Sequence, residues 1–195
     1  METIFEIMAR RRSVRACLPE QIKEEQLQSI LAAGRHAPSG GNSRTTHLLV
    51  IQSPEVLAKL RDTVEAAFAA MEVDENAYAS IKNSVRLSRQ GGYEFFYRAP
   101  TLIVTANRRG YGNAMADSAC VLENMMIAAT ALNVGSCWIN QLHWLDEEPS
   151  VRACLRDLGI AEDETVTGGL ALGYPKDEDA FHVMEKDGNP VTYIR

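Results

Sequence analysis

The chain has 195 residues, of which 46% are hydrophobic and 24% are charged, a composition typical of a folded globular protein rather than a disordered one. This length suits a single domain, residues 1–195, with a substantial core. The formal net charge is −6, from 20 Lys and Arg against 26 Asp and Glu. A general nucleic-acid binder needs a cationic surface to neutralise phosphates, so this balance argues against that class.

Export and membrane signals are missing from the sequence. The N-terminus, METIFEIMARRRS, has neither the apolar region nor the small-residue cleavage site of a signal peptide. No apolar run approaches the length needed to cross a bilayer. The cysteines are widely spaced, which indicates reduced thiols rather than disulfides or metal ligands. We therefore expect a soluble, cytoplasmic protein that binds neither membrane nor nucleic acid.

Apolar spacing, prolines and glycines divide the chain into short elements. Pro38 and the Gly40-Gly41 pair interrupt a helical pattern, and Pro54 stands at a first-turn position, where proline is tolerated. In chain order, the patterns predict helices over residues 2–10 and 24–36, a strand over 47–52 and a helix over 54–71.

The second half of the chain continues the alternation. Residues 73–98 are more polar, and we expect helix there with a mobile segment around Gly91 and Gly92. The remaining predicted elements are a strand over 100–107, a helix over 114–133, a strand over 136–140, a helix over 148–157 and a strand over 166–174. Because there is no regular βαβ rhythm, we expect an α+β fold, with helices flanking a mainly antiparallel sheet.

The predicted helix over residues 114–133 is apolar on most of its circumference. A helix with that pattern is buried, either in the centre of one chain or in a subunit interface. The pattern fits both arrangements equally well.

Several catalytic motifs are absent. The nearest approach to a dinucleotide-binding G-x-G-x-x-G, at residues 110–115, lacks the third glycine. The sequence has no P-loop, no H-E-x-x-H and no G-x-S-x-G, and its histidines have no partners at metal-ligand spacing. These absences argue against metal catalysis and serine hydrolysis.

Residues 11–15, Arg-Arg-Ser-Val-Arg, form what we call the arginine segment. If it is extended, Arg11, Ser13 and Arg15 point the same way, because side chains alternate across a strand. Two guanidinium groups around a hydroxyl suit a phosphate, since Arg donates bidentate charge-assisted hydrogen bonds. An exposed basic tether between two helices is the alternative that these residues leave open.

Residues 38–42, Pro-Ser-Gly-Gly-Asn, form the glycine loop. Glycines let a backbone approach a planar ligand closely, and Ser39 and Asn42 can hydrogen-bond to ring carbonyls or hydroxyls. A simple turn at the C-terminus of a helix is the alternative, and the composition describes it equally well.

Taken in order, these segments resemble the FMN-dependent nitroreductase family. The arginine segment matches its R-R-S-x-R, and residues 37–42 match its A-P-S-x-x-N. Further matches lie at residues 99–104 (APTLIV), 133–139 (NVGSCWI) and 168–175 (GGLALGYP). No single match is decisive, but the ordered set runs from about residue 4 to the C-terminus and is specific.

The resemblance implies a three-layer α+β sandwich and a homodimer, with FMN in two sites at the subunit interface beside the long helix. The arginine segment would hold the phosphate and ribityl chain, and the partner subunit would bring its glycine loop to the flavin. A backbone N–H of residues 139–140 would lie near the flavin N5, and a late lysine would contact the phosphate. The residues so implied are Arg11, Arg12, Ser13, Arg15, Pro38, Ser39, Gly40, Asn42, Ile139, Asn140 and Lys186.

The implied activity is an NAD(P)H-dependent oxidoreductase that reduces nitroaromatics, quinones or a related small electrophile by ping-pong hydride transfer. We name no side chain as a general acid, and we interpret Tyr93, Tyr97, His143 and Cys137 as structural. Two alternatives stay open. One is a non-enzymatic FMN-binding redox sensor or flavin carrier, and the other is a different flavin chemistry, such as dehalogenation or ring oxidation.

The chain departs from the family pattern in two places. After Asn42 the family often has a Gln-Pro-Trp-like sequence, whereas this chain has Ser43-Arg44-Thr45-Thr46-His47. Arg44 would place a positive charge near the flavin, and such a charge tunes the electronics of the ring. Residues 78–97, where the family often shapes its substrate pocket, show no residue-level match.

Overall fold

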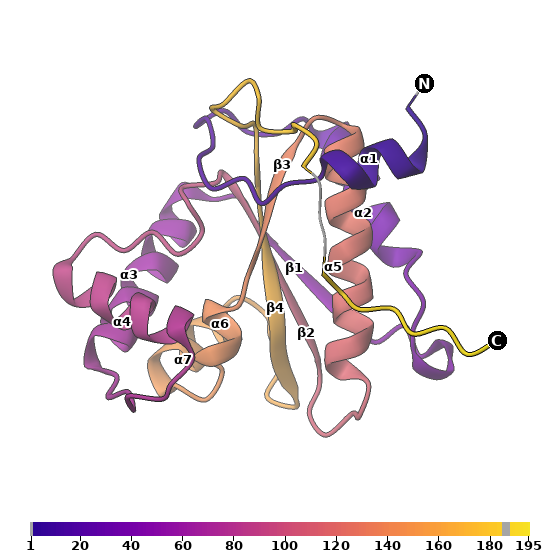
Figure 1. The fold of residues 1–195 in the computed structure, drawn as a ribbon. Coiled ribbons are helices and arrows are strands. Elements are labelled where there is room, and N and C mark those ends of the chain that lie inside the picture. The colour runs from indigo at the N-terminus through magenta and orange to yellow at the C-terminus, as the bar shows by residue number, and fades with distance from the viewer. Residues whose placement is uncertain (1, 185–187) are drawn as a thin grey trace.

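The computed structural model describes residues 2–184 and 188–195 (Figure 1). Its centre is a four-stranded sheet with the order β1-β2-β4-β3, in which every neighbouring pair is antiparallel. The predicted, mainly antiparallel sheet is therefore confirmed. The strands are β1 (His47–Ile51), β2 (Thr101–Arg108), β3 (Gly135–Ile139) and β4 (Glu164–Gly173).

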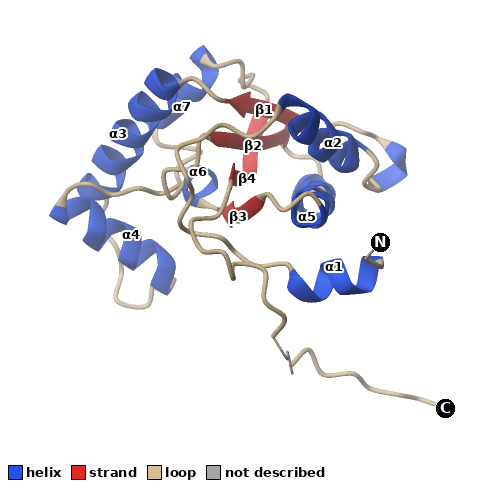
Figure 2. Cartoon of the chain, turned by 90° about the horizontal axis from the view of Figure 1, so that it is seen from above, coloured by secondary structure: helices blue, strands red, loops and turns tan. Residues whose placement is uncertain are grey.

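Helices cover both faces of the sheet and make three layers, as the α+β expectation required (Figure 2). Two helices, α2 (Glu24–Arg35) and α5 (Ala114–Ala131), lie on one face. The other face carries α3 (Pro54–Ala70), α4 (Ala79–Gln90), α6 (Gln141–Trp144) and α7 (Pro149–Asp157). The short α1 (Ile4–Arg10) packs against α5.

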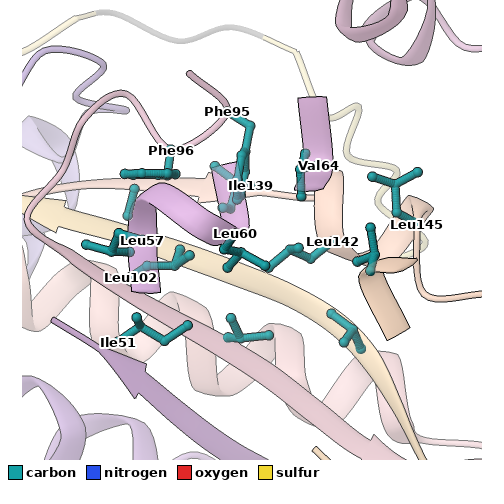
Figure 3. Packing of buried hydrophobic residues seen from close by; sticks show 14 of the residues in the cluster. Ile51, Leu57, Leu60, Val64, Phe95, Phe96, Leu102, Ile139, Leu142 and Leu145 are labelled. Carbon is teal, nitrogen blue, oxygen red and sulfur yellow. The ribbon is translucent and has the colours of Figure 1, made fainter. Parts of the chain in front are cut away.

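Each face of the sheet has its own apolar core. On the α3 side, Leu60 of α3, Leu102 of β2 and Leu142 of α6 are almost fully buried and belong to one cluster (Figure 3). Because alternate side chains of a strand point to opposite faces, a strand covered on both faces is apolar throughout. This explains why β2 and β4 appear in the sequence as continuous apolar runs.

The structure corrects some sequence predictions. Helix α6 was not predicted, because its four residues are too few to show a helical period. Within a single chain, helix α5 is not wholly central, since Met115 is 46% exposed and Cys120 and Glu123 are also exposed, which leaves the subunit-interface alternative. Residues 73–98 contain one helix, α4, followed by Gly91 and Gly92 at positive φ. Within the described residues, no helix is long and apolar enough to span a membrane.

Candidate active site

The arginine segment is extended and fixed along the edge of the sheet. Val14 N donates to Ser136 O of β3 over 2.9 Å, and Ser13 and Ser136 form a parallel bridge. Further on, Lys176 N donates to Ala16 O over 3.0 Å. A backbone held by these hydrogen bonds is not a loose tether between two helices, which was the alternative that the sequence left open.

Cationic side chains of this segment border a hollow of about 330 Å³. Its lining includes Arg12, Ser13 and Arg15, with His182 among the residues on the other side. Arg12, and not Arg11, therefore accompanies Ser13 and Arg15 here, which differs from the strict alternation expected. Five successive residues, 12–16, border the hollow, so strand alternation does not decide which of them reach it. Lys186 lies outside the described residues.

The guanidinium group of Arg12 is only partly satisfied by the protein. Its Nη1 donates to Arg11 O over 2.9 Å, but its Nε and Nη2 are buried without a partner among the described residues. Buried N–H donors are normally paired, and an unpaired one indicates a missing acceptor. An anion in the adjoining hollow is the kind of acceptor that a guanidinium group prefers.

Arg15 connects this hollow to a second, aromatic one. Its guanidinium carbon lies 5.9 Å from the centroid of the Tyr97 ring, and a hydrogen bond with Tyr97 raises the pKa of Arg15. Burial raises the pKa of Tyr97. Arg15 therefore stays charged and Tyr97 stays protonated at neutral pH. Tyr97 is held in the left-handed region at φ 59°, which is uncommon for a bulky residue and typical of a functional constraint.

The second hollow, which we call the aromatic pocket, has a volume of about 480 Å³ and lies between α4, the end of β3 and α6. Tyr78 and Trp144 meet edge to face on its wall, with ring centroids 5.9 Å apart. Sequence reasoning missed both residues, and the only available signal was the concentration of tyrosines in the polar stretch 73–98. The aromatic lining consists of Tyr78, Tyr93, Tyr97, Trp138 and Trp144.

Ile139 and Asn140, which the family resemblance places near the flavin, both border the aromatic pocket. The Ile139 side chain is buried in the core, so only its backbone is available. Asn140 Oδ1 accepts from Trp138 Nε1 over 2.8 Å. Asn140 N already donates to Gln141 Oε1 over 3.1 Å, so a ligand acceptor at that N–H must displace the Gln141 side chain.

Cys137 and His143 are packed as structural residues. Cys137 is buried, and burial raises the pKa of its thiol. His143 Nδ1 lies 2.7 Å from Val166 O. Neither geometry leaves a free proton donor aimed into the aromatic pocket.

The glycine loop forms a short 3₁₀ turn, Gly40–Asn42, after α2. Gly41 and Asn42 are in the left-handed region at φ 58° and 57°. A Cβ added at Gly40 would lie 2.0 Å from Asn113 Nδ2, so a side chain here would have to displace that amide. At Gly41 a Cβ would meet open space, which leaves that face of the loop accessible.

One chain does not bring the arginine segment and the glycine loop together (Figure 1). Gly40 N donates to Asp117 in the first turn of α5, whereas Arg10, next to the arginine segment, donates to Asn133 beyond the last turn. The sixteen residues between these contacts correspond to about 24 Å at 1.5 Å per residue. Ser39 and Asn42 instead bond to Arg44, through its N and Nε.

Several known proteins resemble this chain in sequence and in fold. The model of the nitroreductase family matches residues 8–174. A protein of Archaeoglobus fulgidus, provisionally named NADH dehydrogenase/NAD(P)H nitroreductase, is 30% identical over 97% of this chain and 95% of its own length. A nitroreductase with bound FMN from Bacteroides fragilis superposes with a TM-score of 0.88 and 34% identity, covering 100% of both chains. A second, from Desulfitobacterium hafniense and also with bound FMN, has a TM-score of 0.81 and 25% identity over 100% of both chains.

Proposed function

The chain belongs to the nitroreductase family, and from this premise we propose that it is an FMN-dependent oxidoreductase. NAD(P)H would be the electron donor, as the name of the archaeal relative suggests. A nitroaromatic, a quinone or a related small electrophile would be the acceptor. The whole chain, residues 1–195, would act as one domain, and a cytoplasmic location stays a prediction from its composition.

The observation that carries the proposal is the buried, unpartnered guanidinium edge of Arg12 beside a hollow shared with Ser13 and Arg15. A flavin phosphate supplies several acceptor oxygens and a negative charge, which this donor set fits. Arg15 also borders the aromatic pocket, so one ligand can have its phosphate at the arginine segment and its ring between aromatic walls. FMN has that combination of groups.

FMN, when bound, supplies the hydride chemistry, and the protein supplies position and electrostatics. The arginine segment would hold the phosphate, while the aromatic pocket would exclude water and accept flat reactants. A single pocket would admit the donor and then the oxidant in turn, which corresponds to a ping-pong order. Cys137 is buried and His143 Nδ1 faces the Val166 carbonyl, so neither is assigned as a general acid.

We further propose a homodimer with the site between subunits. The arginine segment and the glycine loop of one chain lie at opposite ends of α5, so both can border one flavin only if a second copy supplies the loop. Apolar side chains exposed on α1 and α5 are available for such a contact. They are Ile4, Phe5 and Met8 of α1 and Met115 of α5.

The test is spectroscopic and kinetic. Purified protein is expected to be yellow, or to take up FMN, and its bound flavin should bleach anaerobically with NADH or NADPH. A colourless protein that takes up no FMN would contradict the proposal. Bleaching by dithionite but by neither nicotinamide would favour a redox sensor or flavin carrier. Turnover of nitroaromatics, quinones and halogenated aromatics then separates reduction from another flavin chemistry.

A further inference from the structure

We propose that Asp117 is a positioning residue for the active site of the neighbouring subunit, because its carboxylate sets the shape of the glycine loop. The inference rests on the proposed function in one respect, namely that this loop serves a flavin bound by the partner. The contacts that support it lie within one chain.

The Asp117 carboxylate accepts hydrogen bonds from the glycine loop and from Ser43, the residue that follows it. It is 5% exposed and stands in the first turn of α5. Its Oδ1 accepts from Gly40 N over 2.9 Å, and its Oδ2 accepts from Ser43 Oγ over 3.3 Å. Among the described residues, no lysine, arginine or histidine forms an ion pair with it. Its charge is therefore compensated by hydrogen-bond donors and by the positive end of the α5 dipole.

The hydroxyl of Tyr111 lies close to the same carboxylate and to the loop. It lies 3.0 Å from Asp117 Oδ2, 3.1 Å from Gly40 O and 3.1 Å from Ser43 Oγ. The hydroxyl has one proton, so it donates to one of these atoms at a time and can accept from Ser43. Gly40 N is thus bonded to Asp117, and Gly40 O and Asp117 Oδ2 are alternative acceptors for the Tyr111 hydroxyl.

The loop needs such a support because its backbone is strained. Asn42 and Arg44 have φ of 57° and 51°, in the left-handed region that non-glycine side chains rarely adopt. Such conformations cost energy and persist only when surrounding contacts impose them. Without the Asp117 carboxylate, Gly40 N and Ser43 Oγ lose their acceptor, and we expect the loop to relax away from this shape.

The position of the glycine loop decides which subunit's flavin site a change at Asp117 would disturb. Asp117 lies at one end of α5, and the arginine segment of the same chain lies beyond the other end, about 24 Å away at the helical rise. A change at Asp117 should therefore leave the phosphate contacts of its own chain intact. It should disturb the flavin that the partner holds.

The first experiment compares single variants of the full-length holoprotein. Asp117→Asn keeps the side-chain volume and an oxygen for Gly40 N, but it removes the negative charge and puts an N–H donor in place of the Oδ2 acceptor that faces Ser43 and Tyr111. We expect a drop in kcat/KM of tenfold or more and a shift in the visible absorption and circular dichroism of the bound flavin, with the thermal transition retained. Tyr111→Phe should give the same spectral change in weaker form. The control, Asp157→Asn in the last turn of α7, should leave spectrum and rate unchanged. A wild-type spectrum and rate in Asp117→Asn would overturn the proposal.

The second experiment tests the action across subunits. Arg15→Ala and Asp117→Asn chains, carrying different tags, are co-expressed and the mixed dimer is isolated. If Asp117 serves the partner, one site combines both defects and the other is wild type, so the mixed dimer should recover about half of the wild-type turnover. If Asp117 serves its own chain, both sites are damaged and no recovery occurs, which would refute the proposal.

These outcomes are separable from failure of the proposed function. If wild-type protein neither takes up FMN nor responds to NADH or NADPH, the proposed function fails before any variant is compared. If wild-type protein turns over and Arg15→Ala loses FMN, the proposed function holds, and the Asp117→Asn variant and the mixed dimer decide the role of Asp117.

Discussion

The Gln141 side chain donates from Nε2 to the hydroxyl oxygen of Tyr93 over 2.9 Å, and this bond joins α6 to the turn after α4. Ser84 Oγ lies 2.8 Å from the same hydroxyl. All three residues line the aromatic pocket. The wall of the pocket is therefore held by a small polar network centred on Tyr93, and not by apolar packing alone.

Tyr93→Phe should loosen this wall without touching the phosphate site. Loss of the hydroxyl leaves Ser84 and Gln141 without their shared partner, which costs about 1 kcal/mol. We expect the KM for the oxidant to rise a few-fold, while the Kd for FMN stays within about twofold of wild type. Steady-state kinetics and FMN titration check this. Ser84→Ala removes one of the two bonds to the Tyr93 hydroxyl, together with a bond within α4 to Ser80 O, and should raise the KM less. An equal or larger rise would contradict a role centred on Tyr93.

Arg15→Ala should weaken FMN binding strongly. Arg15 borders both the phosphate hollow and the aromatic pocket, so its loss removes charge-assisted hydrogen bonds of about 1.5 to 3 kcal/mol. The Kd for FMN should rise about tenfold to a hundredfold, as measured by quenching of flavin fluorescence. The Kd of Arg15→Lys should lie between those of wild type and Arg15→Ala, since an ammonium keeps the charge but cannot donate two parallel hydrogen bonds as a guanidinium does. Arg108→Ala, at the exposed end of β2, is the control. Equal affinity in all four proteins would remove Arg15 from the site.

The sequence predicted the sheet well because the strands carry their own signal. Residues 47–52, 100–107 and 166–174 are apolar runs bounded by breakers, and the structure places β1, β2 and β4 there to within a few residues. Burial on both faces makes such runs continuous, so no periodicity was needed to find them. The four residues of α6 carry no comparable signal, and no local pattern could have revealed them.

The candidate site was less predictable because tertiary packing assembles it. Tyr78 and Trp144 are far apart in the sequence and meet only because α4 and α6 pack together. Arg12 borders the hollow with its neighbours on both sides of the Ser13 bridge, which alternation alone cannot show. The contact between Gly40 and Asp117 joins residues far apart in the sequence, so no local pattern could indicate it.

Asp146→Ala should destabilise the fold. Asp146 is 4% exposed and accepts from Arg109, Arg152, Thr165 Oγ and Val166 N. Removing a buried carboxylate leaves charged partners and a backbone N–H unsatisfied, so we expect the free energy of unfolding to fall by about 3 kcal/mol. Urea denaturation at one fixed protein concentration measures it, because association with a second copy would also contribute.

Glu147→Ala is the matched control for Asp146. Glu147 pairs with the same Arg109, but its side chain is 82% exposed. Exposed ion pairs contribute little, so its loss should cost less than about 1 kcal/mol. An equal loss of unfolding free energy in the two variants would show that burial does not increase the contribution of the Asp146 carboxylate to stability.

Cys17 should make the fold less stable at alkaline pH. Burial raises the pKa of its thiol to about 11, whereas an exposed thiol titrates near about 8.5. Above that lower value the unfolded chain loses the proton while the folded chain keeps it, so the free energy of unfolding falls as pH rises toward 11. One such group contributes a slope of at most about 1.4 kcal/mol per pH unit. Cys17→Ala should lower stability at neutral pH but flatten this slope, whereas Cys120→Ala, an exposed thiol, should leave the slope unchanged. Urea unfolding at several pH values from 8 to 10.5 gives the slopes, and identical slopes in wild type and Cys17→Ala would exclude Cys17 as their source.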